Sequence, residues 1–106
     1  MKYAVMNWMI RPDLVMTSKE AIGALMEHTR YMKGLEEQGK VIMAGGFMDG
    51  TGGMDIIECD TLDEALDISK NDPLAKANLI RQDIKAWSTD LEARNKMFTE
   101  MYEKLG

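Results

Sequence analysis

The sequence predicts an α+β domain of the ferredoxin-like βαββαβ type, in which two helices cover one face of a four-stranded antiparallel sheet. The first observation is the order of the elements, since apolar runs typical of strands alternate with capped, amphipathic stretches typical of helices. The second is that only a glycine-rich loop, residues 49–53, separates the two central apolar runs. Two strands joined in this way are expected to pair as an antiparallel hairpin.

The four predicted strands are bounded by turn residues and span residues 2–10, 40–48, 54–60 and 79–87. The first carries apolar residues at both parities, which indicates cover on both faces. Pro12 ends it, because proline restricts the residue before it and has no N–H to give to a ladder. In the second strand, Gly45 and Gly46 predict a β-bulge, or a place where a ligand approaches the backbone closely.

Three helix starts are predicted by capping boxes, in which a threonine N-cap is followed three residues later by glutamate. The three boxes are Thr17–Glu20, Thr61–Glu64 and Thr89–Glu92. The first helix is expected to reach about Gln38, because Gly39 is a natural residue to follow a helix end. The third helix comes after the main pattern. We therefore expect one domain over residues 1–87 and a C-terminal amphipathic extension over residues 88–106.

Composition argues against several classes of function. The chain has 106 residues, the length of one domain, and a formal net charge of −5 without a basic cluster. A net acidic surface argues against nucleic-acid binding, which needs lysine and arginine to displace counterions. No stretch is long and apolar enough for a membrane span, and we expect no signal peptide. Cys59 is the one cysteine of the sequence, so we expect no disulfide within the chain and a cytoplasmic location. His28 is the one histidine, and a single cysteine and a single histidine are too few for a Cys/His metal site.

Self-association is expected because the two core helices cover only one face of the predicted sheet. In small domains a second copy usually covers the other face and the open edge. The sequence therefore predicts a homodimer or a higher homo-oligomer, and the last helix either covers part of the sheet or swaps onto the partner. The eleven methionines are compatible with an interior that re-packs around a ligand, or simply with methionine in place of leucine in the core.

Several short motifs, taken in their order and spacing, resemble the YCII-related family of small dimeric α+β barrel proteins over about residues 2–87. The motifs are the helix with His28, the segment Gly39–Gly46, the strand Asp55–Glu58, the helix start Leu62–Ala65, and Asp72-Pro73. Three positions depart from the pattern. Where this chain has Gly46, the family often has proline; where it has Leu74, the family often has an aromatic residue; and where it has Asn78, the family often has glycine. These departures fall on the suspected cleft, so the resemblance leaves ligand and reaction open.

The resemblance implies an active pair made of a histidine and an aspartate, here His28 and Asp72. Some family members resemble enzymes that dehydrochlorinate hydroxylated aromatics. His28 lies in the apolar stripe of the first helix, where it either serves as a general base or acid or is a core histidine with bonded ring nitrogens. Asp72 precedes Pro73 and either caps the turn or orients the histidine ring, and the two roles are compatible.

Other residues are candidates for binding a small ligand. Trp8 and Phe47, with Trp87, either wall an aromatic-sized pocket or belong to the core. Arg11, Arg30, Tyr31 and Arg81 are candidates for an anionic group. Adjacent helix residues point about 100° apart, so at most one of Arg30 and Tyr31 shares the face of His28. Gly45 and Gly46 lack a following Lys-Ser/Thr, which argues against a phosphate loop.

Two functions from different classes follow from these observations. The first is a small cofactor-free enzyme of the lyase or isomerase type, which uses His28 for proton transfer on a small, hydroxylated or aromatic substrate bound between the first helix and the sheet. Proton transfer is favoured over acyl transfer because no serine or cysteine nucleophile is evident, and Cys59 is expected to be a buried apolar residue. The alternative is a non-catalytic ligand-binding or accessory domain whose last helix contacts a partner protein.

Overall fold

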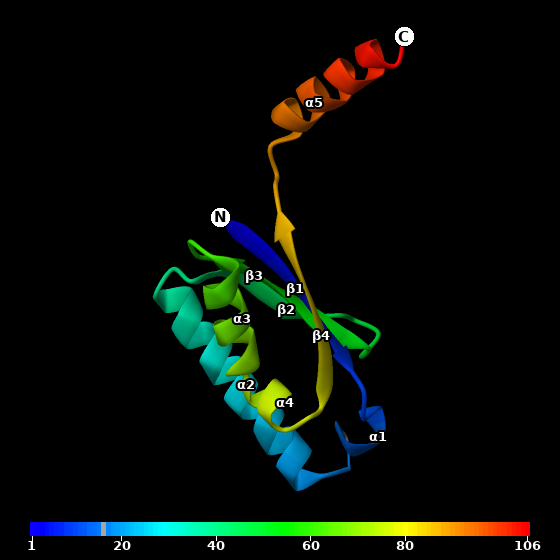
Figure 1. Cartoon of the computed structure of the whole chain (residues 1–106). Coiled ribbons are helices and arrows are strands. Elements are labelled where there is room, and N and C mark those ends of the chain that lie inside the picture. The colour runs from blue at the N-terminus through cyan, green and yellow to red at the C-terminus, as the bar shows by residue number, and fades with distance from the viewer. Residues whose placement is uncertain (16) are drawn as a thin grey trace.

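The computed structural model describes residues 1–15 and 17–106 and confirms the α+β fold (Figure 1). The strands are β1 (Lys2–Met9), β2 (Val41–Gly46), β3 (Gly52–Glu58) and β4 (Ile80–Trp87). They form one antiparallel sheet in the order β2-β3-β1-β4. The βαββαβ order is therefore the one that the sequence predicts.

The helices divide into a layer against the sheet and one separate helix. The long α2 (Lys19–Glu37), α3 (Leu62–Lys70) and the short α4 (Pro73–Lys76) lie on one face of the sheet (Figure 1). A four-residue helix, α1 (Pro12–Val15), connects β1 to α2. The last helix, α5 (Leu91–Lys104), lies away from the sheet and the other helices. No described helix is long and apolar enough to cross a membrane.

The core lies between the sheet and the helix layer, in two apolar clusters. On β1, alternate residues face the helices, and Tyr3 and Val5 belong to a cluster with Met32 and Leu35 of α2. The second cluster lies at the other end of α2 and consists of Ala21, Leu74, Leu79 and Ile80, with Met9 packed against it. Between Val5 and Met9, the helix-facing position of β1 is the buried polar residue Asn7. The two apolar clusters are thus separated by a polar position.

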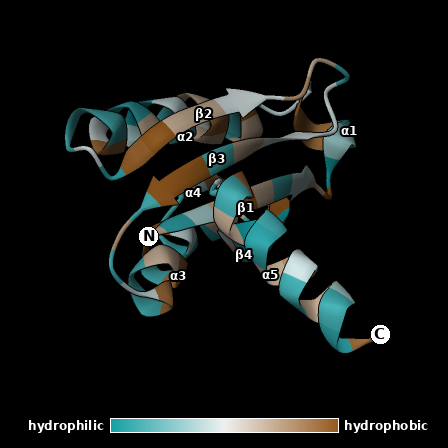
Figure 2. Ribbon diagram, turned by 90° about the horizontal axis from the view of Figure 1, so that it is seen from above, coloured by the Kyte–Doolittle hydropathy of each residue, from teal (hydrophilic) through white to brown (hydrophobic). Residues whose placement is uncertain are grey.

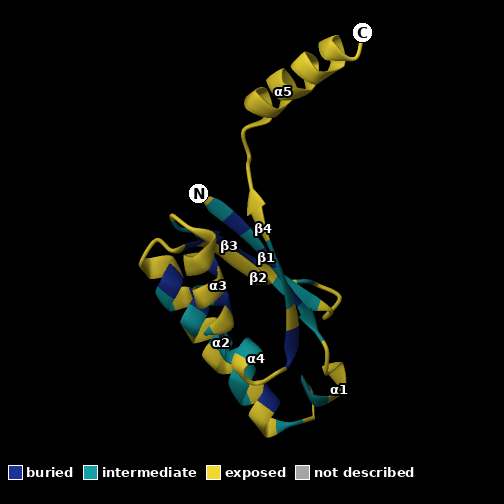
Figure 3. Ribbon diagram, viewed as in Figure 1, coloured by how far each residue is buried: buried dark blue, intermediate teal, exposed yellow. Residues whose placement is uncertain are grey.

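The other face of the sheet, which we call the outer face, is not covered by any helix among residues 1–15 and 17–106. Residues directly paired across an antiparallel sheet share a face, so Met43, Met54 and Trp87 lie on the outer face with Ala4 and Met6. Met43 is 63% exposed and Trp87 46%. Figure 2 shows hydrophobic residues along β2 and β3, and Figure 3 shows that α5 is exposed along its whole length. The exposed apolar residues of α5 are Leu91, Met97, Phe98, Met101, Tyr102 and Leu105.

Two of the three predicted helix caps are wrong by one residue. The N-cap of α2 is Ser18, whose Oγ accepts the N–H of Ala21 at 3.3 Å. The hydroxyl of Thr17 instead donates to the carbonyl oxygen of Asp13, four residues earlier. The N-cap of α5 is Asp90 rather than the threonine before it, in keeping with the stronger N-cap preference of aspartate. The cap at Thr61 is confirmed.

The bulge predicted at Gly45 and Gly46 is also wrong. Both glycines pair regularly with β3, and the register shift lies between Val41 and Met43, so the extra residue is at the start of β2. Glycines are needed here because the backbones approach closely. A Cβ at Gly53 would lie 2.5 Å from the carbonyl oxygen of Gly45. Glycine thus permits tight pairing of β2 with β3 instead of a bulge.

Candidate functional site

A cavity of about 610 Å³ lies between α2 and the helix-facing side of the sheet. From α2 its walls include Leu25, His28 and Met32, and from the sheet they include Asn7 and Asp55. The glycines of β2 and β3 also line it, and the absence of side chains there leaves space. The wall is thus mostly apolar, with a few polar groups from both layers, which is typical of small-molecule sites.

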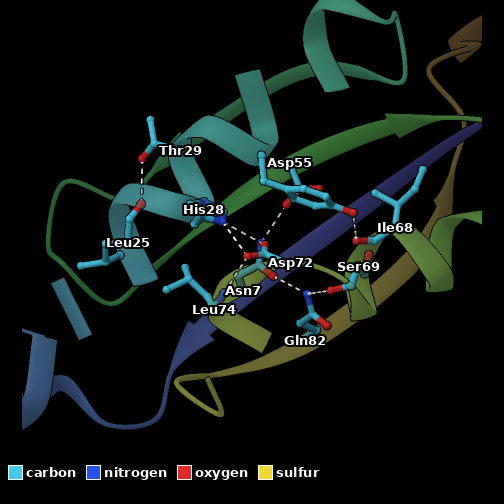
Figure 4. Close-up of polar contacts among 11 residues, drawn as sticks. Asn7, Leu25, His28, Thr29, Asp55, Ile68, Ser69, Asp72, Leu74 and Gln82 are labelled. Carbon is cyan, nitrogen blue, oxygen red and sulfur yellow. Dashed lines mark hydrogen bonds and ion pairs between the residues drawn. The ribbon is translucent and has the colours of Figure 1, made fainter. Parts of the chain in front are cut away.

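His28 and Asp72 are in contact, as the resemblance implies (Figure 4). The ring Nδ1 of His28 lies 2.9 Å from each carboxylate oxygen of Asp72. The Asp72 side chain is 1% exposed and that of His28 is 24% exposed. The aspartate is therefore held inside the protein, while the histidine reaches the cavity from α2.

Asp72 is also the N-cap of α4, and its Oδ1 accepts the N–H of Leu74 at 2.9 Å. The two roles considered for Asp72, turn cap and contact of the histidine, therefore occur together. A carboxylate only accepts hydrogen bonds, so an ionised Asp72 makes Nδ1 the donor of the ring. The neutral ring then carries its lone pair on Nε2, which has no hydrogen-bond partner among residues 1–15 and 17–106. This is the tautomer that a general base requires.

Asp55 is a second buried carboxylate and lines the cavity, and it is not among the site residues predicted from the sequence. It lies on β3 and is 3% exposed. The amide nitrogen Nδ2 of Asn7 donates to its Oδ1 at 2.8 Å. The Oδ1 of Asn7 in turn accepts from Gln82, whose Nε2 also donates to the carbonyl oxygen of Ser69 (Figure 4). The sequence contains one signal for this group, an aspartate inside an otherwise apolar strand.

Burial raises the pKa of Asp55 to about 6, because desolvation penalises the charged form. The hydrogen bond from Asn7 acts in the opposite direction. Among the nearby charges, Asp72 raises the pKa and His28 lowers it. Asp55 therefore exchanges its proton within reach of neutral pH, which is unusual for an aspartate.

Several of the predicted ligand-binding residues lie away from the cavity. Gly45 and Gly46 line it, but Arg11, Tyr31, Trp8 and Phe47 do not. Trp8 lies on the outer face, with its ring 5.6 Å from that of Phe47. The hydroxyl of Tyr31 donates to the carbonyl oxygen of Ile68 at 2.8 Å, and Arg11 pairs with the exposed Asp13.

The other candidates from the sequence are surface groups. Arg30 pairs with Glu27 and Arg81 with Asp83, both in exposed positions. Trp87 is on the outer face rather than in the core. Cys59 is half-buried rather than buried, and desolvation raises the pKa of its thiol, so it is not an activated nucleophile.

The fold and the cavity define a small ferredoxin-like α+β protein with a histidine–aspartate contact at a cavity wall. The sequence model of the YCII-related domain matches residues 1–88, and the chain belongs to the YCII-related family. It is 37% identical over 60 residues to the uncharacterised protein YjpA of Bacillus subtilis (strain 168), which is 57% of this chain and 71% of YjpA. α5 lies outside the matched residues.

A solved structure has the same fold. It is 5-chloro-2-hydroxyhydroquinone dehydrochlorinase (TftG) from Burkholderia phenoliruptrix AC1100 in complex with 2,5-dihydroxybenzoquinone. The TM-score is 0.65 at 22% identity, and the match covers 83% of this chain and 94% of TftG. The similarity supports the fold of the present chain.

Proposed function

We propose that the protein is a small enzyme of the lyase or isomerase type, which transfers protons on a small hydroxylated ring compound bound in the cavity. The contact between His28 and Asp72 carries the proposal. A buried carboxylate that orients a partly exposed histidine leaves Nε2 free to accept a proton from a bound molecule. Asp72 also stabilises the imidazolium that forms when His28 takes that proton.

The ligand class rests on the size and walls of the cavity and on the structural neighbour. A volume of about 610 Å³ with apolar walls suits a single substituted ring. The neighbour TftG is named as a dehydrochlorinase of a chlorinated hydroxyhydroquinone and holds a dihydroxybenzoquinone. We propose a substrate of related chemistry, a ring that carries hydroxyl groups and loses or moves a proton during the reaction.

Turnover by a His28→Ala variant tests the proposal. The assay is chloride release or the absorbance change on 5-chloro-2-hydroxyhydroquinone and related hydroxylated rings. Loss of a general base is expected to reduce kcat by about 10²–10⁴-fold. Arg30→Ala, an exposed change on the same helix, is the control and is expected to retain wild-type turnover. Unchanged turnover in a folded His28→Ala variant would contradict the proposal.

A second candidate is a binding or accessory domain without catalysis, and α5 favours it. This helix carries six exposed apolar residues and lies outside the residues matched by the family. We also propose that the protein is a homodimer joined through the outer face, since exposed apolar side chains of this kind mark interaction surfaces. In the binding-domain reading, ligands bind in the cavity without turnover and α5 contacts the partner.

A further inference from the structure

Asp55 is a buried carboxyl group on the cavity wall for which the proposed function gives no role. Its neighbours across the sheet show that it faces the helix layer, because it pairs with Val5 of β1 and Ala44 of β2. It therefore belongs to the sheet wall of the cavity, whereas His28 belongs to the helix wall. A molecule bound in the cavity would be in contact with both walls.

The hydrogen bonds of Asp55 leave one of its oxygens free. Oδ1 accepts from Asn7, and Asn7 is itself fixed by Gln82, which is anchored to the Ser69 carbonyl oxygen. Oδ2 has no hydrogen-bond partner in the described part of the chain. Oδ2 is not among the fully buried, unpartnered side-chain atoms of the described residues, and Asp55 lines the cavity. This oxygen is therefore open to a hydrogen bond with a molecule bound in the cavity.

We propose that Asp55 is a second acid–base group of the site, which gives a proton to the substrate atom that gains electrons while His28 takes a proton from another atom. This inference rests on the proposed function and adds a catalytic residue to it. The raised pKa supports this role, because it keeps a fraction of the carboxyl groups in the acid form near neutral pH. Two groups that exchange protons, placed on opposite walls of one cavity, are an arrangement that suits an acid step and a base step on the same bound molecule.

The proposed step balances for an elimination. His28 takes a proton from a substrate carbon next to a carbonyl group, and Asp55 in its acid form gives its proton to the carbonyl oxygen, so that an enol forms. The enol then returns its O–H proton to the Asp55 carboxylate, the carbonyl group re-forms, and the leaving group departs as an anion with the electron pair of its bond. His28 gives its proton to water, so the substrate has lost one proton and one leaving anion. In an isomerisation the enol takes a proton back at another carbon, and no group leaves.

Other charged side chains around the cavity enter the pH dependence. They are Lys33 and Glu36 on α2, together with His28, and Asp72 at the start of α4. Replacing only Asp55 by asparagine keeps these groups in place and removes one titration. The amide has nearly the shape of the carboxyl group but gives no proton to the substrate.

The first test uses wild-type protein and NMR during titration with 2,5-dihydroxybenzoquinone. The ring signals of His28 need no assignment because it is the single histidine, and the carboxyl signal of Asp55 is identified by its absence from Asp55→Asn. Both signals are expected to shift along one binding curve. Asp83 lies on the outer face of the same sheet and is the control, so the chemical shift of its carboxyl signal is expected to stay unchanged.

The outcomes separate the inference from the function on which it rests. A shift of His28 without a shift of Asp55 would overturn the role of Asp55 and leave the proposed function standing. If neither group shifts, the proposed function fails, and the inference fails with it. A shift of both groups supports the two proposals together.

The second test is kinetic. Asp55→Asn is expected to lower kcat by about 10²-fold with little change in KM. It is also expected to remove the fall in rate above about pH 6, where Asp55 loses its proton. Asp83→Asn is expected to keep the wild-type pH profile. A purely structural role of Asp55 would lower the rate and leave the shape of the profile unchanged, which would overturn the inference.

Discussion

Replacing Asp55 by asparagine is expected to change how the stability of the protein depends on pH. The folded-state pKa of about 6 lies roughly 2 units above the value of 3.8 for an unperturbed aspartate. The folded protein therefore binds more protons than the unfolded chain between about pH 4 and pH 6, and its stability falls as pH rises through this window. At 1.36 kcal/mol per unit, the full shift corresponds to about 3 kcal/mol. Because the unfolded chain is already more than half ionised at pH 4, the loss of stability between pH 4 and pH 7 is about 2.4 kcal/mol.

Urea unfolding of wild type and Asp55→Asn at several pH values measures this difference, at one protein concentration throughout. Asparagine cannot ionise, so the stability of the variant relative to wild type is expected to rise by about 2.4 kcal/mol between pH 4 and pH 7. The exposed Asp60→Asn is the control, with curves expected to stay within about 0.5 kcal/mol of wild type. A constant difference between wild type and Asp55→Asn at all pH values would refute the argument that burial raises the pKa.

Three further predictions concern packing, capping and assembly. Gly53→Ala is expected to destabilise the protein by about 1–3 kcal/mol in thermal unfolding, since a Cβ there would lie 2.5 Å from a backbone oxygen of β2. Gly23→Ala in α2 is the control and is expected to stabilise the protein, because a Cβ there would meet nothing within 4 Å. A stabilising Gly53→Ala and a destabilising Gly23→Ala would contradict the strand geometry. Ser18→Ala is expected to cost about 1 kcal/mol and Thr17→Ala less, whereas equal losses would return the cap to the threonine. Deletion of residues 89–106 is expected to weaken self-association in sedimentation analysis, and a truncated chain that keeps its oligomer and all its partners would count against a role of α5 in assembly.

Local sequence signals were sufficient to predict the order of strands and helices. Glycine and proline mark most boundaries, and threonine with glutamate three residues later correctly marks the cap at Thr61. These local signals gave the wrong residue where two neighbouring residues could both serve as the N-cap of a helix. Ser18 and Asp90 each follow a threonine that is also a good N-cap, and only the local backbone path selects between them.

The site was predictable only in part, because contacts between distant segments have no local signal. The pair of His28 and Asp72 is separated by 44 positions and came from the resemblance to a family rather than from periodicity. Asp55 was missed because its importance depends on Asn7 of another strand and on a cavity that only the folded chain forms. The aromatic side chain of Trp8 makes it a candidate for the wall of a ligand pocket, although the alternation of side chains along β1 assigns it to the outer face.

The central claim is that His28 presents a free ring nitrogen to a ligand in the cavity. Carbethoxylation by diethyl pyrocarbonate, located by mass spectrometry, tests this claim most directly because His28 is the single histidine. Without ligand, His28 is expected to react, and saturating 2,5-dihydroxybenzoquinone is expected to slow the reaction strongly. A histidine that does not react, or that reacts at the same rate with and without the quinone, would contradict the account.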